Sequence, residues 1–168
     1  MAKKWSKEKY TDDSYGGFDV AYELINDMRE QDMQDIVASG GDVVFEICAS
    51  LQGCQENYIY RGENEELLAI MGISTPIPNT KGRSIWMLGT NALNDMSYYK
   101  QLLITEAKQV IAQWVKEYGL LFNAVNKNND KSIRWLTRLG AEWNGETIEI
   151  DGNVFLKFTI TERGVKNV

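Results

Sequence analysis

The strongest constraint on the fold is a succession of three elements in the second half of the chain. Apolar side chains recur at helical spacing over residues 97–118, and Gly119 follows as a C-terminal stop. The apolar stretch 120–125 then has the length of a buried strand. A second helix is capped by residues 128–130 and stops at Gly140. Helix, buried strand and helix in this order predict an α/β fold, with helices packed against a sheet.

Shorter patterns predict the remaining elements. Polar and apolar residues alternate over residues 18–24, which predicts a first strand. The other expected elements are helices near 28–37 and 43–51, strands at 57–61, 67–74 and 83–88, and a final hairpin of 147–150 with 154–160. The order β-α-α-β-β-β-α-β-α-β-β predicts a mixed, mostly antiparallel sheet of six to seven strands, with about four helices on its two faces.

Composition excludes several kinds of active site. The 168 residues include no histidine, so Ser-His-Asp and Cys-His nucleophile systems and His-ligated zinc are ruled out. With 18 Lys and Arg against 24 Asp and Glu, the net charge is −6, which argues against general nucleic-acid binding. Cys48 and Cys54 match no redox or metal-binding spacing, and we expect reduced thiols and no bound metal.

Residues 1–16 are expected to form an N-terminal arm or tail before a single domain at 17–168. Four lysines lie here among Trp5, Tyr10 and Tyr15, without a sustained apolar period. The segment is either a solvated extension or an arm that docks on a partner through its aromatic side chains. No stretch of the chain approaches the roughly 18 apolar residues of a membrane span, so we expect a cytoplasmic protein.

Two stretches of the second half resemble a known fold family. The segment Asn129-Asp130-Lys131-Ser132-Ile133-Arg134-Trp135-Leu136-Thr137-Arg138-Leu139-Gly140-Ala141 resembles the second conserved motif of the GNAT acetyltransferases. Together with Phe155-x-x-Phe158-Thr159-Ile160-Thr161, it also resembles the GNAT-like internal virion proteins of short-tailed phages. The similarity is best over residues 84–163.

The resemblance implies a coenzyme A site. The pantetheine arm would enter a slot between two splayed strands, 85–90 and 120–125, and the pyrophosphate would meet the start of the long helix. Gly89 stands where a bulge between these strands is useful, or is an ordinary strand-end glycine. The implied cofactor-binding residues are Leu88, Gly89, Thr90, Ser97, Asn123, Asn129 and Ser132.

Several of these residues also have a structural explanation. Asn123 and Asn126 need hydrogen-bond partners if they are buried, so each either bridges the splayed strands or contacts a ligand. Asn128, Asn129 and Ser132 surround a helix start, where capping accounts for them without a ligand.

The sequence departs from the family pattern at two points. The loop 90–97 lacks the paired glycines and the Arg or Gln of the pyrophosphate loop, and Asp95 adds a negative charge there. Leu136 stands where many members have a tyrosine that reprotonates the coenzyme A thiolate. The loop departure predicts weak or absent binding of acetyl-CoA, and Leu136 removes the usual general acid, since leucine cannot donate a proton.

Replacement catalytic groups come from outside the motifs. Glu46, Glu65 and Glu66 are candidates for the base that deprotonates an amine, or are simply solvated charges. Tyr98 is the candidate general acid, with Tyr99 and Tyr118 as alternatives on the same helix.

Two functional hypotheses remain. The motif losses favour a phage accessory protein on a GNAT-like scaffold, which would contact phage or host proteins in virion assembly or inside the virion. The alternative is an active acetyl-CoA-dependent N-acetyltransferase that modifies an amine on a host or phage protein. Backbone donors at Leu88, Gly89 and Thr90 would then stabilise the oxyanion. Either protein would act in the host cytoplasm, and the sequence leaves the oligomeric state open.

Overall fold

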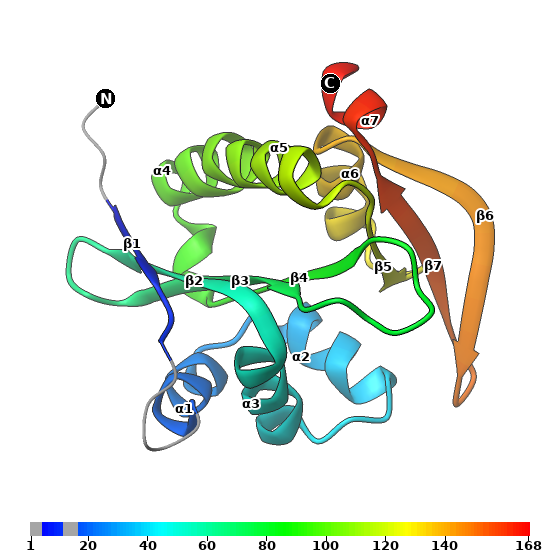
Figure 1. Ribbon diagram of the computed structural model, residues 1–168. Helices are drawn as coiled ribbons and strands as arrows, with labels where there is room; N and C mark the ends of the chain where they lie inside the picture. The colour runs from blue at the N-terminus through cyan, green and yellow to red at the C-terminus, as the bar shows by residue number, and fades with distance from the viewer. Residues whose placement is uncertain (1–4, 12–16) are drawn as a thin grey trace.

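The computed structural model of the protein describes residues 5–11 and 17–168. A single seven-stranded sheet runs through it in the order β1-β2-β3-β4-β5-β7-β6, with helices on both faces (Figure 1). The strands are β1 (Trp5–Lys9), β2 (Cys54–Gly62), β3 (Leu67–Ser74), β4 (Arg83–Gly89), β5 (Leu121–Asn126), β6 (Ala141–Ile150) and β7 (Asn153–Ile160). Strands β4 and β5 pair in parallel, and every other pair of neighbours is antiparallel.

The helices form two layers around this sheet. They are α1 (Phe18–Asn26), α2 (Glu30–Ala38), α3 (Val43–Gly53), the 3-10 turn η1 (Asn91–Asn94), α4 (Met96–Tyr98), the π-helix η2 (Tyr99–Glu106), α5 (Ala107–Tyr118), α6 (Asp130–Arg138) and α7 (Glu162–Lys166). Figure 1 shows α1, α2 and α3 below the sheet and α4, α5 and α6 above it. The inner strand β3 is therefore covered on both faces. It has seven buried residues in a row, as such a strand requires, whereas most residues of the edge strand β6 are exposed.

The mixed, mostly antiparallel sheet with helices on both faces is as the sequence predicts. One predicted element is wrong, because residues 18–24 form helix α1 instead of a strand. Ala21 and Leu24, three residues apart, are fully buried, whereas Phe18 and Tyr22 are exposed. The buried residues thus follow the spacing of a helix, and the alternation of polar and apolar residues over this short stretch does not indicate a strand.

The N-terminal segment also differs from the expectation of an arm. Trp5–Lys9 is the edge strand β1, paired antiparallel with β2 from Trp5↔Gly62 to Lys9↔Tyr58. The Trp5 ring packs edge-on against Tyr60, with ring centroids 5.6 Å apart. The partner strand lies some fifty residues later in the chain, so no local pattern indicates the pairing. Tyr15, the third proposed anchor, lies outside the described residues.

The long helix begins at Met96, close to the predicted start, but it is not uniform. Its second segment, η2, is a π-helix of eight residues, and regular α-helix resumes at Ala107. Trp114 of α5 is completely buried in the core above the sheet. Gly119 ends the helix with a φ of 79°, a conformation that glycine adopts without strain.

The cysteines, the helix lengths and the placement of the acidic residues bear on possible disulfides, membrane spans and metal sites. Both cysteines carry free thiols, with Cys48 buried and Cys54 partly buried. No helix among residues 5–11 and 17–168 is long and apolar enough to cross a bilayer. The same residues contain no group of three or more carboxylates and thiols placed to hold a metal ion.

Candidate functional site

The two parallel strands at the centre of the sheet separate after a short contact. Strands β4 and β5 pair only at Arg83↔Leu121 and Ser84↔Phe122. One residue further on, the Asn123 side chain replaces a backbone bond, since its Nδ2 donates to the Ile85 carbonyl at 2.6 Å. Asn123 thus bridges the point of divergence, and beyond it the strands leave a slot. This is the splayed arrangement that the sequence resemblance implies.

The slot is a cavity of about 450 Å³ that passes between the two strands. Its middle is apolar, and its residues come from β4, β5, α5, α6 and β7. They include Ile85, Met87, Ile111, Val125, Trp135, Leu136 and Phe158. Three carboxylates line it as well, Asp32 and Asp35 from α2 and Glu46 from α3. The cavity thus combines an apolar channel with acidic groups from the α2 and α3 side.

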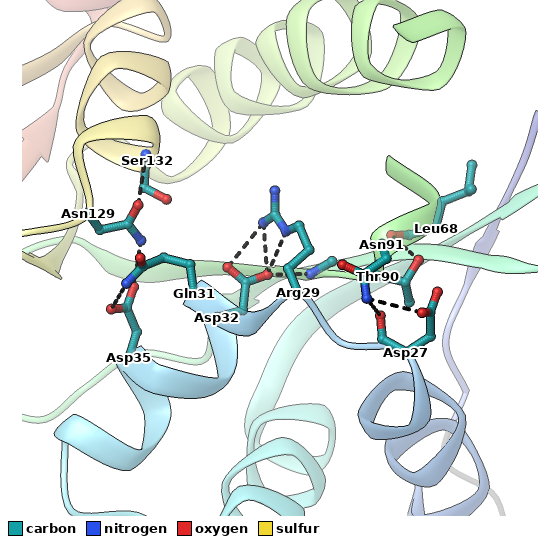
Figure 2. Close-up of polar contacts among 11 residues, drawn as sticks. Asp27, Arg29, Gln31, Asp32, Asp35, Leu68, Thr90, Asn91, Asn129 and Ser132 are labelled. Atoms are coloured by element: carbon teal, nitrogen blue, oxygen red, sulfur yellow. Dashed lines mark hydrogen bonds and ion pairs between the residues drawn. The ribbon is translucent and has the colours of Figure 1, made fainter. Parts of the chain in front are cut away.

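The start of α2 lies directly against the end of β4. The Arg29 N–H donates to the Gly89 carbonyl at 3.0 Å, and the Gly89 N–H donates to Asp32 Oδ2 at 2.8 Å. The same Asp32 oxygen accepts from Arg29 Nη2 at 2.8 Å and from Nε at 3.0 Å (Figure 2). Thr90, by contrast, donates its N–H to Leu68 of β3, because successive peptide groups of a strand point to opposite sides. The Gly89 peptide group therefore faces away from β3 and is held by α2.

A second carboxylate of α2 contacts the helix on the opposite face of the sheet. Asn129 Nδ2 donates to Asp35 Oδ2 at 2.7 Å, and Gln31 Nε2 donates to Asp35 Oδ1 at 3.2 Å. Burial raises the pKa of Asp35 above its ordinary value, the nearby Asp32 adds to this, and the two hydrogen bonds oppose it only in part. The raised pKa makes the Asp35 carboxylate a better proton acceptor than an ordinary aspartate.

A larger groove adjoins the slot between the start of α2, the turn η1 and helix α6. Its volume is about 710 Å³, and Asp32, Ser132 and Trp135 line both cavities. The groove contains four basic side chains, Arg29, Lys131, Arg134 and Arg138, against the acidic Glu30 and Asp32. On a chain of net charge −6, this local excess of positive charge distinguishes the groove.

Helical geometry explains why α6 presents its cations together. Lys131, Arg134 and Arg138 are spaced three and four residues apart and so share one side of the helix, while Leu136 faces the core. In the described part of the chain, none of these three cations forms an ion pair. Unpaired cations lining a concave surface are suited to bind an anion such as phosphate.

The structure brings some of the sequence-predicted site residues together. Leu88, Asn123, Ser132 and the candidate base Glu46 line the slot, and Gly89 adjoins it through Asp32. Asn129 lines the groove, and its Oδ1 also caps α6 by accepting the Ser132 N–H at 3.1 Å.

Other predicted site residues lie elsewhere or have structural partners. Tyr98 and Glu65 line neither cavity: the Tyr98 hydroxyl donates to Glu66 Oε1 at 2.9 Å, and Glu65 lies exposed in the β2–β3 turn. Ser97 directs both its N–H and its hydroxyl at Asp95, which fills the helix start where phosphate was expected. Thr90 uses its hydroxyl to bond the Leu67 carbonyl.

Sequence reasoning missed the residues that give the site its charge. Asp32 and Asp35 reach the slot only because α2 packs across the ends of β4 and β5, and Arg29 joins the groove for the same reason. The cations of α6 did carry a signal, since their spacing places them on one helix face. The family resemblance instead points to the loop before the long helix as the place for phosphate.

Comparisons with known proteins bear on the fold. No family model and no curated protein matches the sequence. Solved structures do match. An aminoglycoside N(6′)-acetyltransferase from Legionella pneumophila covers 99% of this chain and 97% of its own length, with a TM-score of 0.68 and 12% identity. A GNAT-family acetyltransferase from Bacillus anthracis covers 97% and 98%, with a TM-score of 0.65 and 12% identity.

A third structure is the spermidine N-acetyltransferase from Vibrio cholerae, which covers 95% of this chain and 94% of its own, with a TM-score of 0.63 and 9% identity. At such low identity these likenesses establish the fold, which is that of the GNAT acetyltransferases.

Proposed function

We propose that the protein is an acetyl-CoA-dependent N-acetyltransferase. The proposal rests on one observation, that the slot and the groove adjoin and are lined by side chains of different chemical character. The slot is lined mostly by apolar side chains, the groove carries unpaired cations, and Asp32, Ser132 and Trp135 line both. A ligand with a long amide-bearing arm and a phosphorylated end fits this pair of cavities, and coenzyme A is such a ligand.

The residues present fit coenzyme A at both ends. By strand alternation the Met87 peptide group points to the same side as that of Gly89, which offers strand-like hydrogen bonds to the amides of a pantetheine arm. Arg134 and Arg138 are available for phosphate, as is Lys131. The phosphate site thus lies against α6, in place of the loop around Asp95 that the resemblance implies.

The chemistry is acyl transfer to an amine. Acetyl-CoA, when bound, supplies the acyl group activated as a thioester. The Gly89 N–H is the donor placed to stabilise negative charge on the carbonyl oxygen as the new C–N bond forms and the C–S bond breaks. Asp35 takes the proton lost by the amine, for which its raised pKa suits it, and Glu46 is the alternative acceptor in the same cavity. Leu136 cannot protonate the leaving thiolate, so that proton comes from water.

The activities for which the structural neighbours are named support an amine as the acceptor of the acetyl group. Aminoglycosides and spermidine are cationic amines, and the proteins that act on them share this fold. In this chain the carboxylates Asp32, Asp35 and Glu46 give the slot a negative side, which favours an ammonium group.

A second candidate function is the non-catalytic accessory role, with contacts to phage or host proteins in virion assembly. Leu136 is buried in the slot where a proton donor is expected, and Asp32 already holds the Gly89 N–H. Both observations favour a scaffold that has lost its chemistry.

Titration calorimetry with acetyl-CoA and coenzyme A tests the proposal. We expect micromolar binding to the wild-type protein, and a loss of about tenfold or more in the double variant Arg134→Ala/Arg138→Ala. Lys166→Ala is the matched control, because it removes an exposed cation of α7 that is paired with Glu162. Thiol release in the presence of spermidine and lysine peptides then tests transfer. No binding at millimolar ligand would overturn the proposal and favour the accessory role.

A further inference from the structure

The hydrogen-bond donor that the acyl group needs already has a partner within the protein. Gly89 N–H donates to Asp32 Oδ2 at 2.8 Å, and only 6% of Asp32 is exposed. The Gly89 carbonyl is likewise taken, by the Arg29 N–H at 3.0 Å. Helix α2 therefore closes the Gly89 end of the slot with a carboxylate, which lies where a thioester carbonyl would have to accept its hydrogen bond.

The group that holds this carboxylate belongs to the phosphate groove. Arg29 binds Asp32 through Nε at 3.0 Å and through Nη2 at 2.8 Å, and the Arg29 side chain, 28% exposed, also lines the groove with the three unpaired cations of α6. Figure 2 shows Arg29 and Asp32 together at the start of α2. A phosphate group in the groove would compete with Asp32 for the same guanidinium.

We propose that Asp32 is an internal occupant of the acyl site, and that phosphate binding at Arg29 releases it. The inference rests on the proposed function and adds a regulation of that site. In the free protein the Arg29–Asp32 pair keeps Gly89 blocked. When phosphate engages Arg29, the guanidinium no longer positions Asp32 against Gly89, and the negative charge of the phosphate repels the carboxylate, which leaves the Gly89 N–H to the acyl carbonyl. Coupling of this kind is reciprocal, so a free Gly89 also strengthens binding in the groove.

Two variants separate this coupling from a simple charge effect. Asp32→Asn keeps the side-chain shape but removes the negative charge that Arg29 and Gly89 share. Glu30→Gln removes the same charge from the same groove, and within the described residues the Glu30 side chain bonds only Gln34, one helical turn away. Glu30→Gln therefore measures what the loss of one negative charge does by itself.

The first readout is affinity for two probes. Acetyl-CoA reaches both cavities, whereas adenosine 3′,5′-bisphosphate carries only a phosphorylated end. We expect Asp32→Asn to tighten acetyl-CoA binding about fivefold more than Glu30→Gln does. The bisphosphate should show a similar difference between the two variants, because its phosphate must also displace Asp32 from Arg29. Equal gains in the two variants for acetyl-CoA would overturn the inference.

The second readout follows the Gly89 amide of the wild-type protein directly. In protein labelled with ¹⁵N-glycine, the Gly89 amide signal of the wild type should move on addition of the bisphosphate, toward its position in Asp32→Asn. A Gly89 signal that stays unmoved while the groove saturates overturns the inference alone, since binding itself then supports the proposed function. Absence of any binding of acetyl-CoA overturns the proposed function and this inference together.

Discussion

Asn129 of α6 donates from Nδ2 to the Asp35 carboxylate of α2 at 2.7 Å, although the two residues are 94 positions apart. The other atom of the same amide, Oδ1, accepts the Ser132 N–H and caps α6. One side chain thus both begins a helix and ties it to the helix on the opposite face of the sheet, beside the slot. Its substitution should separate these two contributions.

Asn129→Asp should destabilise the protein more than Asn129→Ser. Both replacements keep an oxygen that caps the helix and lose the Nδ2 donor, but only aspartate places a second negative charge against Asp35. We expect a difference of about 1 kcal/mol in the free energy of unfolding at pH 7, measured by urea denaturation. The difference should shrink in high salt and at acid pH, where the carboxylates are protonated. Equal stability of the two variants would show that the two carboxylates do not interact.

Asp35→Asn should make the protein less sensitive to pH. Burial raises the pKa of Asp35, so the folded state keeps its proton after the unfolded chain, with an ordinary value of 3.8, has lost it. The folded state is therefore favoured below 3.8, and this stability is lost as the pH rises through the folded-state pKa. We expect the stability of Asp35→Asn relative to wild type to increase from pH 3.5 to pH 7 in denaturation curves. An exposed replacement, Glu149→Gln, serves as the control and should show no such trend.

The carboxylate of Glu56 should have the opposite pH dependence. Burial opposes its ionisation, but hydrogen bonds from Tyr118 at 2.6 Å and from Tyr58 at 2.5 Å outweigh it and hold the pKa of Glu56 below its ordinary value of 4.5. The stability that this gives is present above 4.5 and is lost as the pH falls through the lower, folded-state pKa.

Glu56→Gln therefore should cost about 1–3 kcal/mol in unfolding free energy at pH 7, because charge-assisted hydrogen bonds become neutral ones. The cost should decline below pH 4.5, as the wild-type carboxylate itself becomes protonated. A cost that stays constant down to pH 3 would mean that packing, and not charge, is what the substitution removes.

Gly140 and Gly145 both have positive φ angles but differ in how closely other residues approach them, so their alanine variants can be compared. Gly140 has a φ of +98°, and a Cβ there would meet the Gly164 carbonyl carbon at 2.6 Å. Gly145 has a φ of +81°, but a Cβ there would meet no atom of the described residues within 4 Å, its chain neighbours aside. Gly145→Ala should cost about 1 kcal/mol from backbone strain alone. Gly140→Ala should cost clearly more, since the backbones of α6 and α7 must move apart. Thermal unfolding of the two variants measures the difference, and similar melting temperatures would contradict the close contact.

Much of the fold was predictable because its signals are local. Gly119 and Gly140 end their helices with positive φ angles, and Asn129 caps α6, as expected from the sequence. Asp151 and Gly152, with φ angles of 48° and 78°, form the turn of the last hairpin. Local patterns did not predict strand β1, because its partner β2 lies far along the chain. They also gave the wrong element at α1, where the short run of apolar residues is compatible with both strand and helix periodicity.

The site was less predictable because its charged residues meet only through tertiary packing. Asp32 and Asp35 lie on a short helix whose place against β4 no motif indicates. Asp95 is expected from the sequence to place a negative charge beside the phosphates. In the structure it accepts two hydrogen bonds from Ser97 and lines neither cavity. The catalytic roles assigned to Glu46, Glu65 and Tyr98 stay predictions.

The two-residue contact between β4 and β5 joins two hydrogen-bonded ladders of the one sheet, β1 to β4 and β5 to β7. Few backbone bonds must break for these ladders to tilt against each other, and such a tilt widens or narrows the slot. The amide protons of one ladder should then exchange with solvent together, at a rate that differs from that of the other ladder. Adjustment to acyl chains of different width would come from relative movement of two stiff units, with no local unfolding.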